Sequence, residues 1–164
     1  MKTTRKNYDV KNYKDVLKFV KKIYGYKYDE EEQEVIAKTI YVLANSVIDT
    51  NYSFDNIEDY DGLDFDVEMI SNFRHYVVRI DNNEEYRVFF GDWVRDEYAK
   101  ELAKEEVRNI LKEVEEYFPN VVSYIDTKSM VEDFLIDADA LIGTFDGTCS
   151  EIEIDGELVC VYRI

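Results

Sequence analysis

A shortage of chain-breaking residues limits what this sequence can fold into more than any other feature. Its 164 residues include a single proline, Pro119, and six glycines. Because proline and glycine often end helices and strands, a chain with so few of them favours long regular elements. Apolar residues make up 46% of the chain, which is ample material for a core, and the length suits one domain.

Apolar residues at helical spacing predict a helical N-terminal part over residues 12–48. The first helix covers residues 12–25 and ends at a glycine. The second covers residues 29–48, with Asp29 as its cap and three glutamates in its first turn, where the helix dipole favours negative charge. Residues 1–11 are polar and are expected to form a lead-in that is mobile at its start.

Two β-hairpins are predicted further along the chain. The first covers residues 74–90, where two runs rich in β-branched and aromatic residues flank a polar turn at residues 81–85. The second covers residues 150–163 around Asp155-Gly156, which is the strongest turn signal in the sequence.

The remaining segments are predicted to be mainly helical. A long helix over residues 91–118 ends at the proline, and a further helix covers residues 127–143. Residues 121–125 form a short strand or a link, and residues 49–70 are expected to be irregular or only briefly helical. This order of elements predicts a single α+β domain over residues 1–164, in which a small antiparallel sheet of β-hairpins packs against about four helices.

The charge is large and unevenly distributed. The net charge is −17; residues 1–28 hold nine Lys/Arg and two acids, whereas residues 29–164 hold eleven Lys/Arg and 35 acids. Residues 39–73 and 129–162 contain no Lys or Arg at all. Such a body repels nucleic acids and anionic membranes and attracts basic surfaces. The basic helix at residues 12–25 is therefore expected to dock on the acidic body of its own chain rather than to bind a partner.

The sequence shows neither a membrane span nor a secretory signal. No apolar run reaches about 18 residues, and the basic N-terminus lacks an uninterrupted apolar segment. We therefore expect a cytoplasmic protein, in the host cytoplasm if it is phage-encoded. In that compartment the two cysteines, Cys149 and Cys160, are expected to be reduced thiols packed in the core.

No motif predicts catalysis, a cofactor or a bound metal. His75, the only histidine, lies in a predicted strand without a nucleophile motif, which favours a structural role. Residues 57–68 match part of the calcium-loop pattern, since Gly62 falls at the turn and Glu68 at the last ligand position. Ile57 stands where the first carboxylate is required, and it cannot bind calcium. We therefore expect that the protein is not an enzyme.

The acidic residues suggest an interpretation of function. DNA carries one negative charge per about 1.7 Å of its axis. Acids four residues apart on a helix lie about 6 Å apart, close to the phosphate spacing along one strand. In its size, charge, richness in Tyr and Asp and lack of a catalytic signature, the chain resembles the small acidic proteins that phages and mobile elements use against restriction and CRISPR nucleases. The resemblance covers the composition of the whole chain and matches no family motif, so it implies no particular residues.

We therefore expect a non-enzymatic inhibitor of the anti-CRISPR or anti-restriction, DNA-mimic type. It would occlude a basic nucleic-acid-binding site on a host defence nuclease, so its partner is a basic protein surface, with no direct contact to nucleic acid or membrane. The predicted partner-binding residues are acids of the first acidic stretch with two aromatic anchors among them: Asp55, Glu58, Asp59, Tyr60, Asp61, Asp64, Phe65 and Asp66.

Three alternatives remain open from the sequence. An immunity-type inhibitor of a basic nuclease toxin would use the same residues. A carboxylate-metal-dependent enzyme would need acids that converge from separate segments. An acidic adaptor domain would have no inhibitory role.

Overall fold

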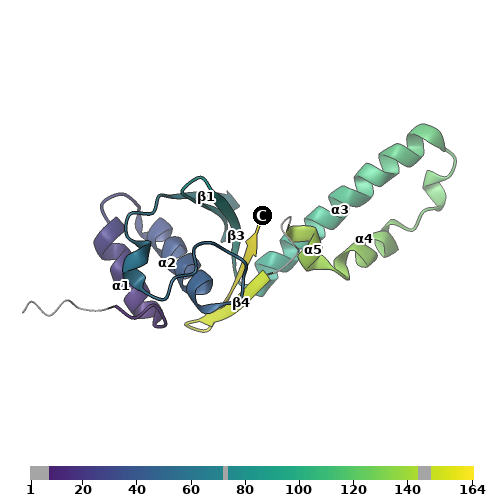
Figure 1. Ribbon diagram of the computed structural model, residues 1–164. Coiled ribbons are helices and arrows are strands. Elements are labelled where there is room, and N and C mark those ends of the chain that lie inside the picture. The colour runs from purple at the N-terminus through teal and green to yellow at the C-terminus, as the bar shows by residue number, and fades with distance from the viewer. Residues whose placement is uncertain (1–7, 72–73, 144–148) are drawn as a thin grey trace, which may run out of the picture.

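The computed structural model describes residues 8–71, 74–143 and 149–164, and its mixed fold confirms the predicted α+β class. Five strands form one antiparallel sheet in the order β1-β2-β3-β5-β4. The strands are β1 (Phe65–Ser71), β2 (His75–Ile80), β3 (Glu84–Phe90), β4 (Cys149–Ile154) and β5 (Glu157–Arg163). Two helices cover one face of the sheet, and a helical arm projects away from the other side (Figure 1). Residues 1–7 of the expected lead-in lie outside the described residues.

Both predicted hairpins form, and their turns follow from the local sequence. Asp155 and Gly156 have φ angles of 51° and 80°, the positive values that a two-residue hairpin turn requires. In the first hairpin Asp81 and Asn82 also have positive φ angles, of 53° and 52°. Asparagine, aspartate and glycine tolerate this left-handed conformation better than other residues, so the sequence places both turns correctly.

Strand β1 corrects the prediction that residues 49–70 are irregular or only briefly helical. It pairs antiparallel with β2, with Val67 opposite Val78. Its apolar residues alternate with acids, so Phe65 faces the core while Asp66 lies exposed on the opposite face. Acids lower the intrinsic preference for a strand, and pairing with a neighbouring strand outweighs that preference here.

Helices α1 (Tyr13–Tyr24) and α2 (Glu30–Asn45) build the layer that covers the sheet. Asp29 caps α2 in a capping box with Glu32, in which each side chain accepts a hydrogen bond from the other residue's backbone N–H. The apolar side of α2 packs on the sheet, and α1 packs on α2.

The basic helix α1 does dock within its own chain, but its apolar face makes the contact. Val16, Phe19 and Val20 are buried against α2. Its four lysines are exposed, and in the described part of the chain none of them forms an ion pair: Lys14, Lys18, Lys21 and Lys22. Hydrophobic burial therefore holds this helix in place.

The arm begins where α3 (Asp92–Tyr117) leaves the end of β3. With 26 residues, α3 is about 39 Å long. The chain turns through the short 3-10 helix η2 (Val122–Tyr124) and returns along α3 as α4 (Thr127–Leu135) and α5 (Ala138–Ile142) (Figure 1). The predicted link at residues 121–125 is thus a helical turn, and the predicted helix at 127–143 is two shorter helices.

A small second core fixes the base of the arm to the sheet. Val94 and Ala99 of α3 and Ile142 of α5 pack on Phe89, Cys160 and Tyr162, which lie on the sheet face opposite α2. Beyond this base the arm contains only two helices side by side.

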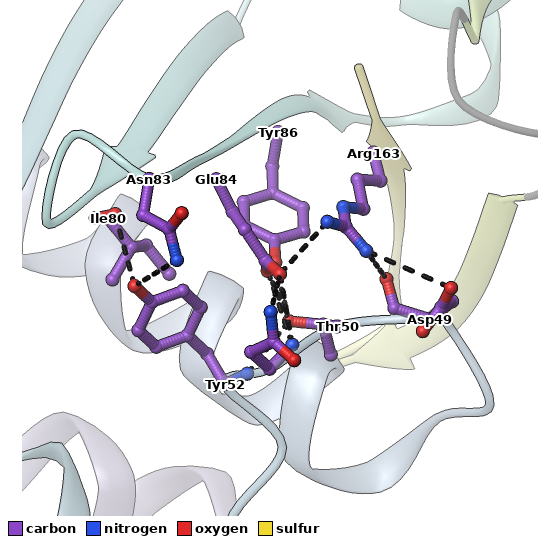
Figure 2. Close-up of polar contacts among 9 residues, drawn as sticks. Asp49, Thr50, Tyr52, Ile80, Asn83, Glu84, Tyr86 and Arg163 are labelled. Atoms are coloured by element: carbon purple, nitrogen blue, oxygen red, sulfur yellow. Dashed lines mark hydrogen bonds and ion pairs between the residues drawn. The ribbon is translucent and has the colours of Figure 1, made fainter.

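A buried carboxylate joins the sheet to the loop that follows α2 (Figure 2). The Glu84 side chain is 1% exposed and accepts hydrogen bonds from the Thr50 hydroxyl at 2.8 Å and the Asn51 backbone N–H at 3.1 Å. Arg163 forms an ion pair with it at 3.0 Å, and the Tyr86 hydroxyl also donates to it. Burial acts to raise the pKa of Glu84, but these hydrogen bonds and the Arg163 charge outweigh burial and lower it.

We predict that Glu84→Gln lowers the free energy of unfolding by about 3 kcal/mol at pH 7, because Arg163 loses its buried counter-charge. The pKa of Glu84 is lowered on folding. The stability that its carboxylate contributes is therefore present above the unfolded pKa of about 4.3, and it is lost as the pH falls through the folded pKa. Urea unfolding of both proteins from pH 7 to pH 3 should show the difference between them narrowing in acid. Glu153→Gln, at an exposed carboxylate of β4, is the control and should change stability little. A difference that does not vary with pH would contradict this role of the carboxylate.

Candidate functional site

A network of buried tyrosines holds the loop that carries the predicted partner-binding acids. The loop contains the short 3-10 helix η1 (Ile57–Tyr60). The buried Tyr60 hydroxyl donates to the Tyr52 carbonyl at 2.7 Å and accepts from the Phe54 N–H at 3.1 Å. The Tyr24 hydroxyl of α1 donates to the Tyr60 carbonyl at 2.5 Å. Burial raises the pKa of Tyr60 to about 12, so this hydroxyl remains a donor at neutral pH.

The six predicted acids are all exposed, but they are not equivalent. Asp64 pairs with Lys27 at 2.7 Å and Asp66 with Arg79 at 3.1 Å. The other four have no ion-pair partner in the part of the chain that the structure describes: Asp55, Glu58, Asp59 and Asp61. We call these four residues the acidic loop. Their carboxylates are available to a partner on a backbone that the tyrosine network holds in place.

The prediction that two aromatic residues anchor a partner is wrong. Tyr60 is 0% exposed and Phe65 is 3% exposed, so neither can contact a partner. Both rings belong to the main core, where burying a large aromatic side chain stabilises the fold. The spacing of Ile57 and Tyr60 on one side of the short helix was the available signal for burial, because both face inward.

The two stretches without Lys or Arg do not form one continuous acidic track. Strand β1 of the first stretch and strand β4 of the second are the opposite edges of the sheet, with β2, β3 and β5 between them. At about 4.8 Å per strand spacing, acids such as Asp66 and Glu153 on these edges lie at least about 19 Å apart. Arg79 and Arg87 of the intervening strands separate them. Any mimicry of DNA must therefore use separate acidic surfaces.

The far end of the arm combines exposed aromatics with acids, and the sequence prediction missed it. We call residues 113–126 the arm tip. Its large apolar side chains are unusually exposed: Tyr117 71%, Phe118 64%, Val121 47% and Tyr124 87%. The segment contains four acids and no Lys or Arg: Glu113, Glu115, Glu116 and Asp126.

The backbone of the arm tip is ordered by its own hydrogen bonds. The Val121 N–H donates to the Phe118 carbonyl and the Tyr124 N–H to the Val121 carbonyl, both at 3.0 Å. The backbone that carries the exposed rings thus needs no further ordering, which favours binding. No signal in the sequence indicated this exposure, because aromatic side chains usually pack in a core and only the direction of the arm keeps these rings away from one.

Two side chains with catalytic potential, His75 and Cys160, are buried. His75 is 2% exposed, stacks on Phe89 at 4.4 Å and accepts a hydrogen bond from Arg87 at 3.2 Å. Burial, with a smaller effect of the Arg87 charge, lowers the pKa of His75 to about 4, so it is neutral at pH 7. The cysteines are free, and burial raises the pKa of Cys160 to about 12, which leaves an unreactive thiol.

No metal site is formed by the residues that the structure describes, where no three His, Cys, Asp or Glu side chains are grouped to hold an ion. In the calcium-loop candidate at residues 57–68, Ile57 is buried and Glu68 contacts Arg79 at 3.3 Å. In the same described ranges, no helix is long and apolar enough to cross a membrane.

No protein-family model, curated protein or solved structure matches the chain.

We predict that His75 makes the protein less stable in mild acid. The pKa of His75 is lowered on folding from about 6.5 to about 4, so folding opposes protonation. The neutral ring makes its full contribution to the free energy of unfolding above pH 6.5, and this contribution declines as the pH falls towards 4. Between pH 7 and pH 5 the wild type should lose about 2 kcal/mol more unfolding free energy than His75→Phe, which cannot titrate. Equal slopes in urea unfolding of the two proteins would show that His75 does not cause the acid sensitivity.

Proposed function

We propose that the protein is a non-enzymatic inhibitor that binds a basic nucleic-acid-binding surface of a host defence nuclease, in the host cytoplasm, and occludes it. The observation that carries this proposal is the arm tip, where exposed aromatics and carboxylates lie together at the end of a projecting arm. Aromatic residues dominate the binding energy of protein interfaces, and carboxylates match a basic partner.

The dimensions of the arm suit a cleft that holds nucleic acid. Two helices side by side are about 20 Å wide, roughly the width of a DNA duplex. Residues 92–142 hold fourteen acids and six Lys/Arg, a net charge of −8. An arm of this width and sign can enter a positively charged cleft and block it sterically.

The acidic loop and the arm tip would act at different stages of binding. The acidic loop lies beside α1, at the end of the molecule opposite the arm tip (Figure 1). Its unpaired carboxylates raise the association rate at low ionic strength, where charges are screened over about 30 Å rather than about 10 Å. The arm tip makes the short-range apolar contacts that set the dissociation rate.

An immunity-type inhibitor of a basic nuclease toxin would use the same surfaces, so such toxins belong among the nucleases tested. An acidic adaptor could also bind a partner through the arm tip. Unlike an inhibitor, it would not displace DNA from that partner. The metal-dependent enzyme has no specific support, because the described part of the chain contains no group of three or more His, Cys, Asp or Glu side chains that could hold a metal ion.

The test is a displacement assay with purified restriction nucleases, CRISPR effectors and basic nuclease toxins, each bound to fluorescent DNA. We expect at least one nuclease to release its DNA when the protein is added. Phe118→Ser with Tyr124→Ser should raise the dissociation rate about 30-fold, since two exposed anchors are lost. Tyr26→Ser with Val47→Ser removes equally exposed apolar side chains elsewhere and should have little effect. The proposal fails if no nuclease is bound, or if nuclease and DNA remain together in the complex.

A second pair of variants isolates the acidic loop. Glu58→Gln with Asp59→Asn should slow association about five-fold at low salt, and the effect should shrink as salt screens the charges. Glu153→Gln with Asp155→Asn makes the same change in net charge at the β4–β5 turn and is the control. Equal slowing by both pairs would indicate that only total charge matters.

A further inference from the structure

A groove between α3 and α4 is lined by charged side chains that are mainly positive, whereas the rest of the body is acidic. Its volume is about 580 Å³. The floor is aliphatic and consists of Val107, Leu111, Val131 and Leu135. Four exposed cations surround it: Lys100, Lys104, Arg108 and Lys128. We call this site the arm groove.

The arm groove holds a large share of the few positive charges in residues 29–164. Residues 29–164 contain only eleven Lys/Arg, and four of them line this one groove. Lys100 and Lys104 are already paired, with Glu97 and Glu101, both at 3.1 Å. Arg108 and Lys128 have no ion-pair partner among the residues described. One acid, Glu132, also lines the groove.

The aliphatic floor is accessible because the arm has only two helices at this point. Val107 is buried, but Leu111, Val131 and Leu135 are only partly covered. The volume falls within the range of about 300–1,000 Å³ that is usual for small-molecule sites, and an apolar lining with a few charged groups is their usual composition.

The two unpaired cations lie at the same end of the groove. Helix α4 runs back along α3 (Figure 1). Among the residues that line the groove, Lys128 at the beginning of α4 therefore lies towards the same end as Arg108 and Leu111 in the later part of α3. The end of α4, with Leu135, lies beside the part that carries Lys100 and Lys104. Asp126 already caps α4, so the side-chain cations, rather than the helix N-terminus, are available to an anion.

We propose that the arm groove binds an amphiphilic anion, a molecule with an apolar chain and a carboxylate, sulfate or phosphate head. Arg108 and Lys128 bind the head, and the aliphatic floor covers the chain. The arm groove of a second copy would bring like charges together, and an uncharged lipid would gain nothing from the two cations. This site is independent of the proposed inhibitor function.

Isothermal titration of the full-length protein with decanoate, to about 1 mM, tests the proposal. We expect saturable binding, with decanol binding more weakly because it lacks the charge. Arg108→Gln with Lys128→Gln should weaken decanoate binding about tenfold. Lys100→Gln with Lys104→Gln changes the net charge equally at the paired cations and should weaken binding by less than about threefold. All four side chains are exposed, so both variants are expected to fold.

Amide NMR shifts in the same titration locate the ligand. Shifts confined to residues near Val131 and Leu111 would support the arm groove. The proposal is overturned by an absence of binding, by equal affinity of the wild type and the Arg108/Lys128 variant, or by shifts elsewhere. These outcomes do not depend on any nuclease, so failure here leaves the inhibitor proposal unaffected.

Discussion

The ion pair between Glu84 and Arg163 connects the core of this protein to its acidic surface. It joins β3 to the end of β5, and the same carboxylate holds Thr50 and Asn51 at the start of the loop after α2 (Figure 2). The backbone carbonyl of the next residue, Tyr52, accepts a hydrogen bond from the Tyr60 hydroxyl. This hydrogen bond fixes the short helix that carries the acidic loop. A surface with four unpaired carboxylates is therefore ordered by contacts that begin in the sheet. Without them, mutual repulsion would favour a disordered loop.

The protein separates the part that stabilises its fold from the part that projects. The sheet, α1 and α2 enclose the large core, and a second, smaller core attaches the arm. The outer arm buries little, because two helices cannot enclose their own apolar side chains. Its exposed rings at the arm tip and its accessible aliphatic groove both follow from this geometry. The two-helix structure of the arm thus accounts for both proposed binding surfaces.

Local signals in the sequence predicted much of the fold. The Asp155-Gly156 turn and the helix cap at Asp29 depend on neighbouring residues, and both form as expected. Strand β1 depends on pairing with β2, which its acid-rich sequence does not reveal. The helix predicted at residues 127–143 is interrupted after Ile136, where Asp137 caps a new helix.

The candidate site was predicted less well than the fold, because exposure is a tertiary property. The acids of residues 55–66 are exposed as expected, but the nearby Tyr60 and Phe65 fill the core. The exposed aromatics lie instead at Tyr117, Phe118 and Tyr124, which the sequence places at the end of a long amphipathic helix. Only the direction of the arm shows that no core reaches them.

Occlusion of a nucleic-acid site by the arm can be tested by hydrogen exchange of the protein, alone and mixed with a nuclease from which it displaces DNA. We predict slower amide exchange in residues 113–126 of the arm tip when the nuclease is present, and loss of this protection when excess DNA is added. Protection confined to the sheet and α2, or protection of the arm tip that excess DNA does not reverse, would contradict occlusion of a nucleic-acid site by the arm.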